Sequence, residues 1–146
     1  MKRYEQLLKS GRIRREKISK AEIRRTLEKA ERDLKTGRKL MEDDLDWGFA
    51  VTYNAALQAS RAYMFSRGYR PASAQGHKNT FAFMALALGK EHRDVITYFD
   101  RMRNKRNRAV YDASGLITET EARNLLRVTR KFVTMIKKRL AETARP

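Results

Sequence analysis

The chain has 146 residues, of which 34 are Lys or Arg and 17 are Asp or Glu, giving a formal net charge of +17 at pH 7. A chain of this length can bury a core of its own, so a single domain is expected. The absence of cysteine excludes disulfides, thiol catalysis and cysteine metal sites. The two histidines, His77 and His92, are too far apart for a zinc or haem motif, and we expect no metal and no cofactor.

The excess of basic residues creates a field that attracts polyanions. Nucleic acid, an acidic protein and anionic lipid all satisfy such a charge, which by itself carries no sequence specificity. No apolar run approaches the roughly eighteen residues needed to span a bilayer, and the N-terminus is charged rather than apolar. We therefore expect a soluble, cytoplasmic protein that does not associate with a membrane.

Apolar residues recur at helical spacing along the chain, and strand-like alternation is scarce. Residues 1–18 are mostly polar and basic, which predicts a short helix or a loosely attached basic arm. Ser19 and Glu22 form a capping-box pattern, so a first long helix should begin there. It is amphipathic, with its apolar face formed by Ile23, Leu27, Leu34, Leu40 and Met41.

The most apolar segment, from Trp47 to Tyr69, predicts a central helix that follows a run of negative charge suited to a helix N-terminus. Its aromatic residues are interpreted as core rather than as base-stacking groups. Tyr69 is different, because it lies between Arg67 and Arg70 at the start of a crossing loop. There it could stack on a base or pack within the loop.

Three further helices are predicted over residues 78–88, 90–111 and about 119–141, the last beginning with a second capping box at Thr118 and Glu121. Five helices joined by short turns predict an all-α, antiparallel up-and-down bundle. We expect residues 19–146 to form this single domain.

The helix predicted over 90–111 carries a basic run on a core-facing pattern. On a helical wheel at about 100° per residue, Arg106 lies in the middle of an apolar stripe made of Val95, Tyr98, Phe99, Met102, Ala109 and Val110. Its guanidinium stays charged and therefore needs a carboxylate, carbonyls or a bound anion. Two interpretations remain open: a structural arginine paired to a carboxylate such as Asp100 or Asp112, or an anion-binding arginine flanked by Arg103, Asn107 and Tyr111.

The segment Arg106-Asn107-Arg108-Ala109-Val110-Tyr111, near the end of a long helix, resembles the motif of the HEPN superfamily. Family members with ribonuclease activity carry an Arg, four to six intervening residues and a His, often with a polar residue directly after the Arg. Arg106 and Asn107 match this motif, and Tyr111 stands where the His is expected. The overall resemblance covers residues 19–141.

The resemblance implies a HEPN bundle that forms a homodimer, with two copies of the motif across a shared cleft that binds RNA or a nucleotide. Many small stand-alone members that resemble this chain pair with a minimal nucleotidyltransferase as a toxin-antitoxin couple. Such a nucleotidyltransferase-fold protein is therefore an expected partner. The dimer must bury enough apolar surface to overcome the repulsion between two highly basic chains.

The tyrosine in place of histidine bears on catalysis. Histidine titrates near pH 6.5 and tyrosine near pH 10, so Tyr111 is a poor general base, although it can donate a proton or a hydrogen bond. The predicted phosphate-binding set is Arg103, Arg106, Asn107 and Arg108. We therefore favour phosphate binding without turnover.

Two alternatives to binding without turnover remain. The first is a metal-independent ribonuclease with Arg106 and Tyr111 as catalytic residues. In that case His77 could face the cleft and replace the missing histidine, although it could equally cap a helix or meet water. His92, beside two charged residues, is interpreted as a surface residue. The second alternative is a non-catalytic basic module that binds an acidic protein.

Overall fold

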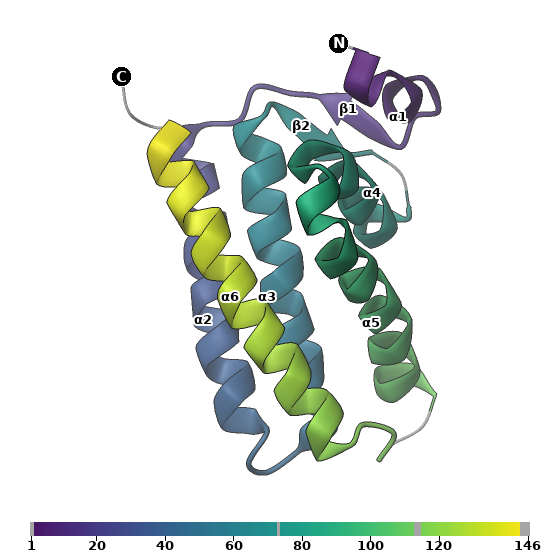
Figure 1. The fold of residues 1–146 in the computed structure, drawn as a ribbon, viewed down its shortest axis with the longest axis vertical. Coiled ribbons are helices and arrows are strands. Elements are labelled where there is room, and N and C mark those ends of the chain that lie inside the picture. The colour runs from purple at the N-terminus through teal and green to yellow at the C-terminus, as the bar shows by residue number, and fades with distance from the viewer. Residues whose placement is uncertain (1, 73, 113–114, 144–146) are drawn as a thin grey trace.

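α-Helices account for most of the computed structural model, which describes residues 2–72, 74–112 and 115–143 (Figure 1). The all-α prediction is confirmed. Within these ranges the helices are α1 (Glu5–Lys9), α2 (Lys20–Leu40), α3 (Leu45–Ser66), α4 (Gly76–Leu88), α5 (Arg93–Tyr111) and α6 (Glu119–Thr143). Short 3-10 turns cover Lys2–Tyr4 and Lys90–His92. Residues 144–146 of the predicted domain lie outside the described residues.

Both predicted capping boxes mark the start of a helix, but only one is reciprocal. Thr118 accepts from the Glu121 amide at 3.1 Å, and the Glu121 carboxylate accepts from the Thr118 amide at 3.0 Å. Ser19 accepts from the Glu22 amide at 3.1 Å. The Glu22 carboxylate instead accepts from Arg70 at 2.7 Å, which ties the start of α2 to the chain beyond α3.

The central position of α3 is evident in its burial. Helices surround it, with α2 and α6 on one side and α4 and α5 on the other, and the longest helices, α2, α3, α5 and α6, alternate in direction along the chain (Figure 1). Most of its side chains are buried. The approach of α2 is closest at Gly37, where an added Cβ would lie 2.3 Å from Thr52 Oγ1 and 2.9 Å from the Thr52 backbone nitrogen. α2 and α3 therefore pack almost backbone to backbone.

The N-terminal segment packs on the bundle through a small sheet that the sequence did not predict. β1 (Ile13–Arg15) pairs antiparallel with β2 (Tyr69–Pro71), so the predicted central helix ends at Ser66, three residues early. Leu7 and Ile13 are buried. Strands of three residues are too short for an alternation to stand out in the sequence.

Tyr69 belongs to the core on this side of the molecule. Its ring lies 5.0 Å from that of Tyr4 and 5.4 Å from that of Phe83, measured between centroids. The Arg15 guanidinium covers it at 5.5 Å and also donates to its hydroxyl at 3.0 Å. The loop-packing interpretation of Tyr69 is therefore the one found, and its ring is not free to stack on a base.

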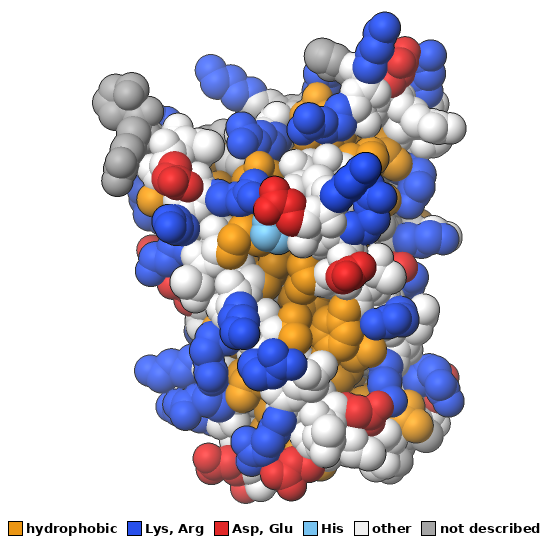
Figure 2. Space-filling view, in the orientation of Figure 1, with side chains coloured by type: hydrophobic (Ala, Val, Ile, Leu, Met, Phe, Trp, Pro, Cys, Tyr) orange, Lys and Arg blue, Asp and Glu red, His pale blue; other side chains and the backbone are white. Residues whose placement is uncertain are grey.

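Lys and Arg side chains are spread over the whole face seen in Figure 2, on both sides of a central strip of hydrophobic side chains. The strip lies where α5 and α6 flank α3 (Figures 1 and 2). The net charge therefore does not locate a binding site, and a local arrangement of side chains has to do so. None of the helices in the described part of the chain is long and apolar enough to span a membrane.

Replacement of Gly37 with alanine tests the contact between α2 and α3. We expect Gly37→Ala to lower the free energy of unfolding by about 1–3 kcal/mol, because the new methyl group meets the Thr52 backbone. Alanine's better helix propensity, about 1 kcal/mol, offsets the loss only in part. Urea unfolding measures this change, and Thr36→Ala, at an exposed position of the same helix, is the control. Equal or greater stability of Gly37→Ala would show that the helices are farther apart.

Candidate phosphate-binding site

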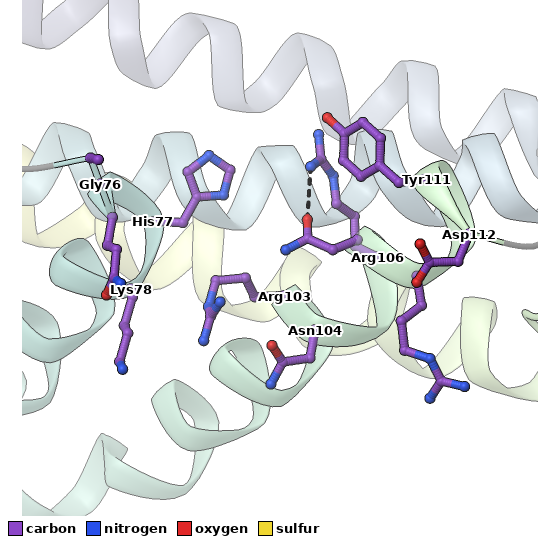
Figure 3. Close-up of a pocket in the computed structure, with 12 residues that line it drawn as sticks. Gly76, His77, Lys78, Arg103, Asn104, Arg106, Tyr111 and Asp112 are labelled. Atoms are coloured by element: carbon purple, nitrogen blue, oxygen red, sulfur yellow. Dashed lines mark hydrogen bonds between the residues drawn. The ribbon is translucent and has the colours of Figure 1, made fainter.

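A cavity of about 790 Å³ lies between the N-terminus of α4 and the C-terminal half of α5 (Figure 3). The five site residues that the sequence predicted, at the motif and one turn before it, all contribute to the wall of this cavity. The described lining residues are Ala74, Gln75, Gly76, His77, Lys78, Arg103, Asn104, Arg106, Asn107, Arg108, Tyr111 and Asp112. The motif of α5 therefore faces a second helix whose contribution the sequence left open.

Arg106 is half-buried between two tyrosine rings. Its guanidinium carbon lies 5.9 Å from the centroid of Tyr53 on α3 and 5.9 Å from that of Tyr111. Nη1 donates to Asn107 Oδ1 at 3.1 Å, the bond dashed in Figure 3. Nε is buried without a hydrogen-bond partner, and within the described ranges no carboxylate forms an ion pair with this side chain. The structural interpretation, in which a core carboxylate neutralises Arg106, is therefore wrong for the residues described.

The flanking basic residues are less enclosed. Arg103 Nε donates to Asp100 Oδ1 at 3.0 Å, one turn earlier on α5, so Asp100 pairs with Arg103 and not with Arg106. Arg108 is exposed. Of the three arginines that line the cavity, Arg106 is thus half-buried, Arg103 is held by a carboxylate and Arg108 is in solvent.

Tyr111 is 73% exposed, so most of its ring is in solvent. In Figure 3 the ring extends from the end of α5 toward the Arg106 guanidinium. Arg106 and Tyr111 are five residues apart, about 140° around the helix axis, so the long arginine side chain is what reaches the Tyr111 ring and the Asn107 amide. Tyr111 covers Arg106 with its ring face and leaves its hydroxyl accessible.

His77 lies in the same cavity, on the first turn of α4. Its Nδ1 is 3.1 Å from the hydroxyl of Tyr53, within hydrogen-bond distance. Burial, with the positive charges of Arg61, Arg106 and Arg103, lowers the pKa of His77 to about 4. The imidazole is therefore neutral at pH 7. In Figure 3 it extends to the same side as Arg106 and Tyr111.

Arg61 on α3 is a charged neighbour of the site that sequence reasoning missed. Its Nη2 would lie 3.3 Å from a Cβ added at Gly76, so the guanidinium packs against this lining residue without lining the cavity itself. Its Nε is buried without a hydrogen-bond partner, and burial lowers its pKa. The available signal was an arginine among apolar residues of a buried helix, the same signal that identified Arg106.

Tyr53 connects these groups. It is fully buried on α3, and burial raises its pKa well above the ordinary value of 10, so its hydroxyl stays protonated. One side of the side chain faces Arg106 and its hydroxyl reaches His77. Across the described residues no group of three or more His, Asp and Glu side chains is arranged to hold a metal ion.

The fold and this cavity define an all-α bundle with a cation-lined pocket at the end of a long helix. A family model of the HEPN domain matches residues 23–140, most of the chain, and the protein belongs to the HEPN domain family. Comparison with curated proteins and with solved structures gave no significant match. Family membership supports a nucleotide- or RNA-related role at the level of the family, whose domains commonly dimerise and bind RNA.

The lowered pKa of His77 makes stability depend on pH. The unfolded imidazole, with its ordinary pKa of 6.5, takes up a proton between about pH 6.5 and 4, whereas the folded one stays neutral. We therefore expect the free energy of unfolding of the wild type, relative to His77→Gln, to fall as the pH decreases through this window and to level off below it. Denaturant unfolding at a series of pH values measures the difference. Parallel curves for the two proteins would contradict the burial of this imidazole.

Proposed function

We propose that the protein binds phosphate groups of RNA or of a nucleotide in the cavity between α4 and α5, without turning the ligand over. The observation that carries the proposal is the state of Arg106. It is a half-buried guanidinium that lines the cavity, has a buried Nε without a hydrogen-bond partner and pairs with no carboxylate of the described chain. A phosphate group in the cavity supplies the counter-charge that this guanidinium lacks.

The charge of the wall supports the same ligand. Lys78, Arg103, Arg106 and Arg108 line the cavity, and of its described lining residues Asp112 is the one acid. The first turn of α4 also opens on this space, and the free amides and positive end of a helix favour an anion there. The paired N–H donors of arginine and the directional donors of backbone amides can together contact several oxygens. A phosphate ligand offers more such oxygens than a carboxylate ligand does.

We also propose that the protein acts as a homodimer, with a nucleotidyltransferase-fold protein as its partner in a toxin-antitoxin-like pair. A second hollow of about 290 Å³ adjoins the motif, where the start of α3 meets the end of α5. Trp47 and Tyr111 both line it, and they are 54% and 73% exposed. Exposed aromatic side chains at such a site are typical of protein contact surfaces. A second copy of the chain that covers these two aromatic side chains also brings its own cavity close to the first one.

Metal-independent ribonuclease activity is the second candidate. It is favoured by one observation, that Arg106, Tyr111 and His77 line the same cavity. In this function Arg106 stabilises the developing charge on the phosphate, and Tyr111 or His77 moves the proton.

Removal of the Arg106 guanidinium tests the phosphate site. We expect Arg106→Ala to weaken the binding of a labelled single-stranded RNA by about tenfold or more, because a charge-assisted hydrogen bond is lost. Arg101→Ala is the matched control: it removes the same charge from an exposed position of α5 outside the cavity. Fluorescence anisotropy at several salt concentrations measures both affinities, and circular dichroism checks the fold.

Two results would decide against binding without turnover at this site. Equal affinities of Arg106→Ala and the wild type would remove Arg106 from the binding site. Cleavage of the RNA by the wild type in EDTA, lost in Arg106→Ala, would establish the ribonuclease instead.

Replacement of Trp47 tests the proposed dimer contact. We expect Trp47→Lys to convert a dimer into a monomer, because a new charge is placed in an apolar contact between two basic chains. Sedimentation velocity measures the change. Leu86→Lys, which alters another exposed large hydrophobic residue away from this hollow, is the control and leaves the dimer intact. A wild-type protein that sediments as a monomer at all concentrations would refute the dimer.

A further inference from the structure

The contact between the Tyr53 hydroxyl and His77 bears on which nitrogen of the imidazole carries the proton. Tyr53 is 0% exposed, and its hydroxyl lies 3.1 Å from His77 Nδ1. A buried hydroxyl has to donate its proton to an acceptor, and Nδ1 is the acceptor within reach among the described residues. When Nδ1 accepts, the single proton of a neutral imidazole lies on Nε2.

The surroundings keep this imidazole neutral. Arg61 on α3, Arg103 and Arg106 on α5 and Lys78 on α4 bring positive charge from each helix packed around it. Tyr53 is uncharged, and the acidic groups near the cavity are Asp100, which is paired to Arg103, and Asp112 on the wall. No carboxylate in the described chain is bonded to His77. Burial and the positive charge of these neighbours disfavour a second proton on the ring.

We propose that His77 is a ligand-binding residue that donates Nε2–H to a phosphate oxygen, in a tautomer fixed by Tyr53, and that it is not a general base. The inference rests on the phosphate binding proposed above and names a further residue of that site. Within the described residues Nε2 makes no hydrogen bond to protein, so this donor is available to a ligand.

This tautomer narrows the chemical class of the ligand. Asn107 Oδ1 already accepts from Arg106, and the arginine and lysine groups of the wall can only donate. With Nε2–H added, the interior of the cavity offers donors from both α4 and α5. A phosphoryl group, with several oxygen acceptors, matches these donors.

The same tautomer removes His77 from catalysis. A general base for the 2′-hydroxyl of RNA needs a free lone pair directed at the substrate. The lone pair of Nδ1 is occupied by Tyr53, and Nε2 carries a proton. The catalytic role considered for His77 as a substitute for the missing histidine is therefore replaced by a binding role.

Nitrogen-15 NMR of the whole protein tests the tautomer directly, because the shifts of an imidazole distinguish an N–H nitrogen from a bare one. At pH 7 we expect a protonated Nε2 and a bare Nδ1 at His77. In Tyr53→Phe, which keeps the ring but removes the hydroxyl, we expect a mixture of the two tautomers. A protonated Nδ1 with a bare Nε2 in the wild type would overturn the inference.

Titration with inorganic phosphate and with pyrophosphate tests the contact. We expect the Nε2–H signal of His77 to shift on binding, with His92 as the internal control. We also expect His77→Ala to lose about threefold to tenfold in affinity, the range for one neutral hydrogen bond. His77→Gln, which offers an amide donor and still accepts from Tyr53, should recover part of the loss.

The titration with phosphate separates the role of His77 from the phosphate-binding function on which that role depends. If phosphate binds with a dependence on Arg106, but His77 does not shift and His77→Ala binds as the wild type does, the role of His77 is refuted and the phosphate site stands. If neither phosphate, pyrophosphate nor RNA binds the wild type, both are refuted. His92→Ala is the matched control and should bind as the wild type does.

Discussion

A line of four aromatic rings, one each from α3, α4, α5 and α6, holds the cavity in shape. Tyr53 on α3 contacts Phe81 on α4 with centroids 6.1 Å apart, Phe81 contacts Phe99 on α5 at 6.1 Å, and Phe99 contacts Phe132 on α6 at 5.0 Å. Contacts of this kind stabilise the core and restrict how the rings can move. Because Tyr53 ends the line at the cavity, the positions of His77 and Arg106 depend on the packing of the whole bundle.

The cavity is costly for the folded state. Two arginines, Arg61 and Arg106, each have a buried Nε without a hydrogen-bond partner, and a group of that kind destabilises a fold. The faces of Tyr53 and Tyr111 offset part of the cost by attracting the Arg106 charge. Natural proteins carry such local violations mainly where function requires them. On the proposed function, a bound phosphate offsets the remaining cost at Arg106 by neutralising its charge.

The sequence predicted those parts of the molecule that depend on one helix at a time. The apolar stripe of α5 identified Arg106, and the capping residues Ser19 and Thr118 located two helix starts. The pairing of β1 with β2 and the contact of Tyr53 with His77 could not be read in this way. Both join segments far apart in the chain, and neither leaves a periodic pattern. Five of the twelve described lining residues come from the start of α4 and the two residues before it, so the chemistry of the cavity needed the tertiary structure.

The charge of the whole molecule and the geometry of the cavity act at different ranges. A net charge of +17, spread over the surface, attracts any polyanion and is screened by salt. The donors around Arg106 act within hydrogen-bond distance, in a partly enclosed space where screening is weaker. On the proposed function, long-range attraction governs how fast an anionic ligand arrives, whereas the fixed directions of Arg106, Asn107 and His77 govern which group is retained. Selection then depends on how rigidly Tyr53 holds its neighbours, since a mobile donor would discriminate little between one anion and another.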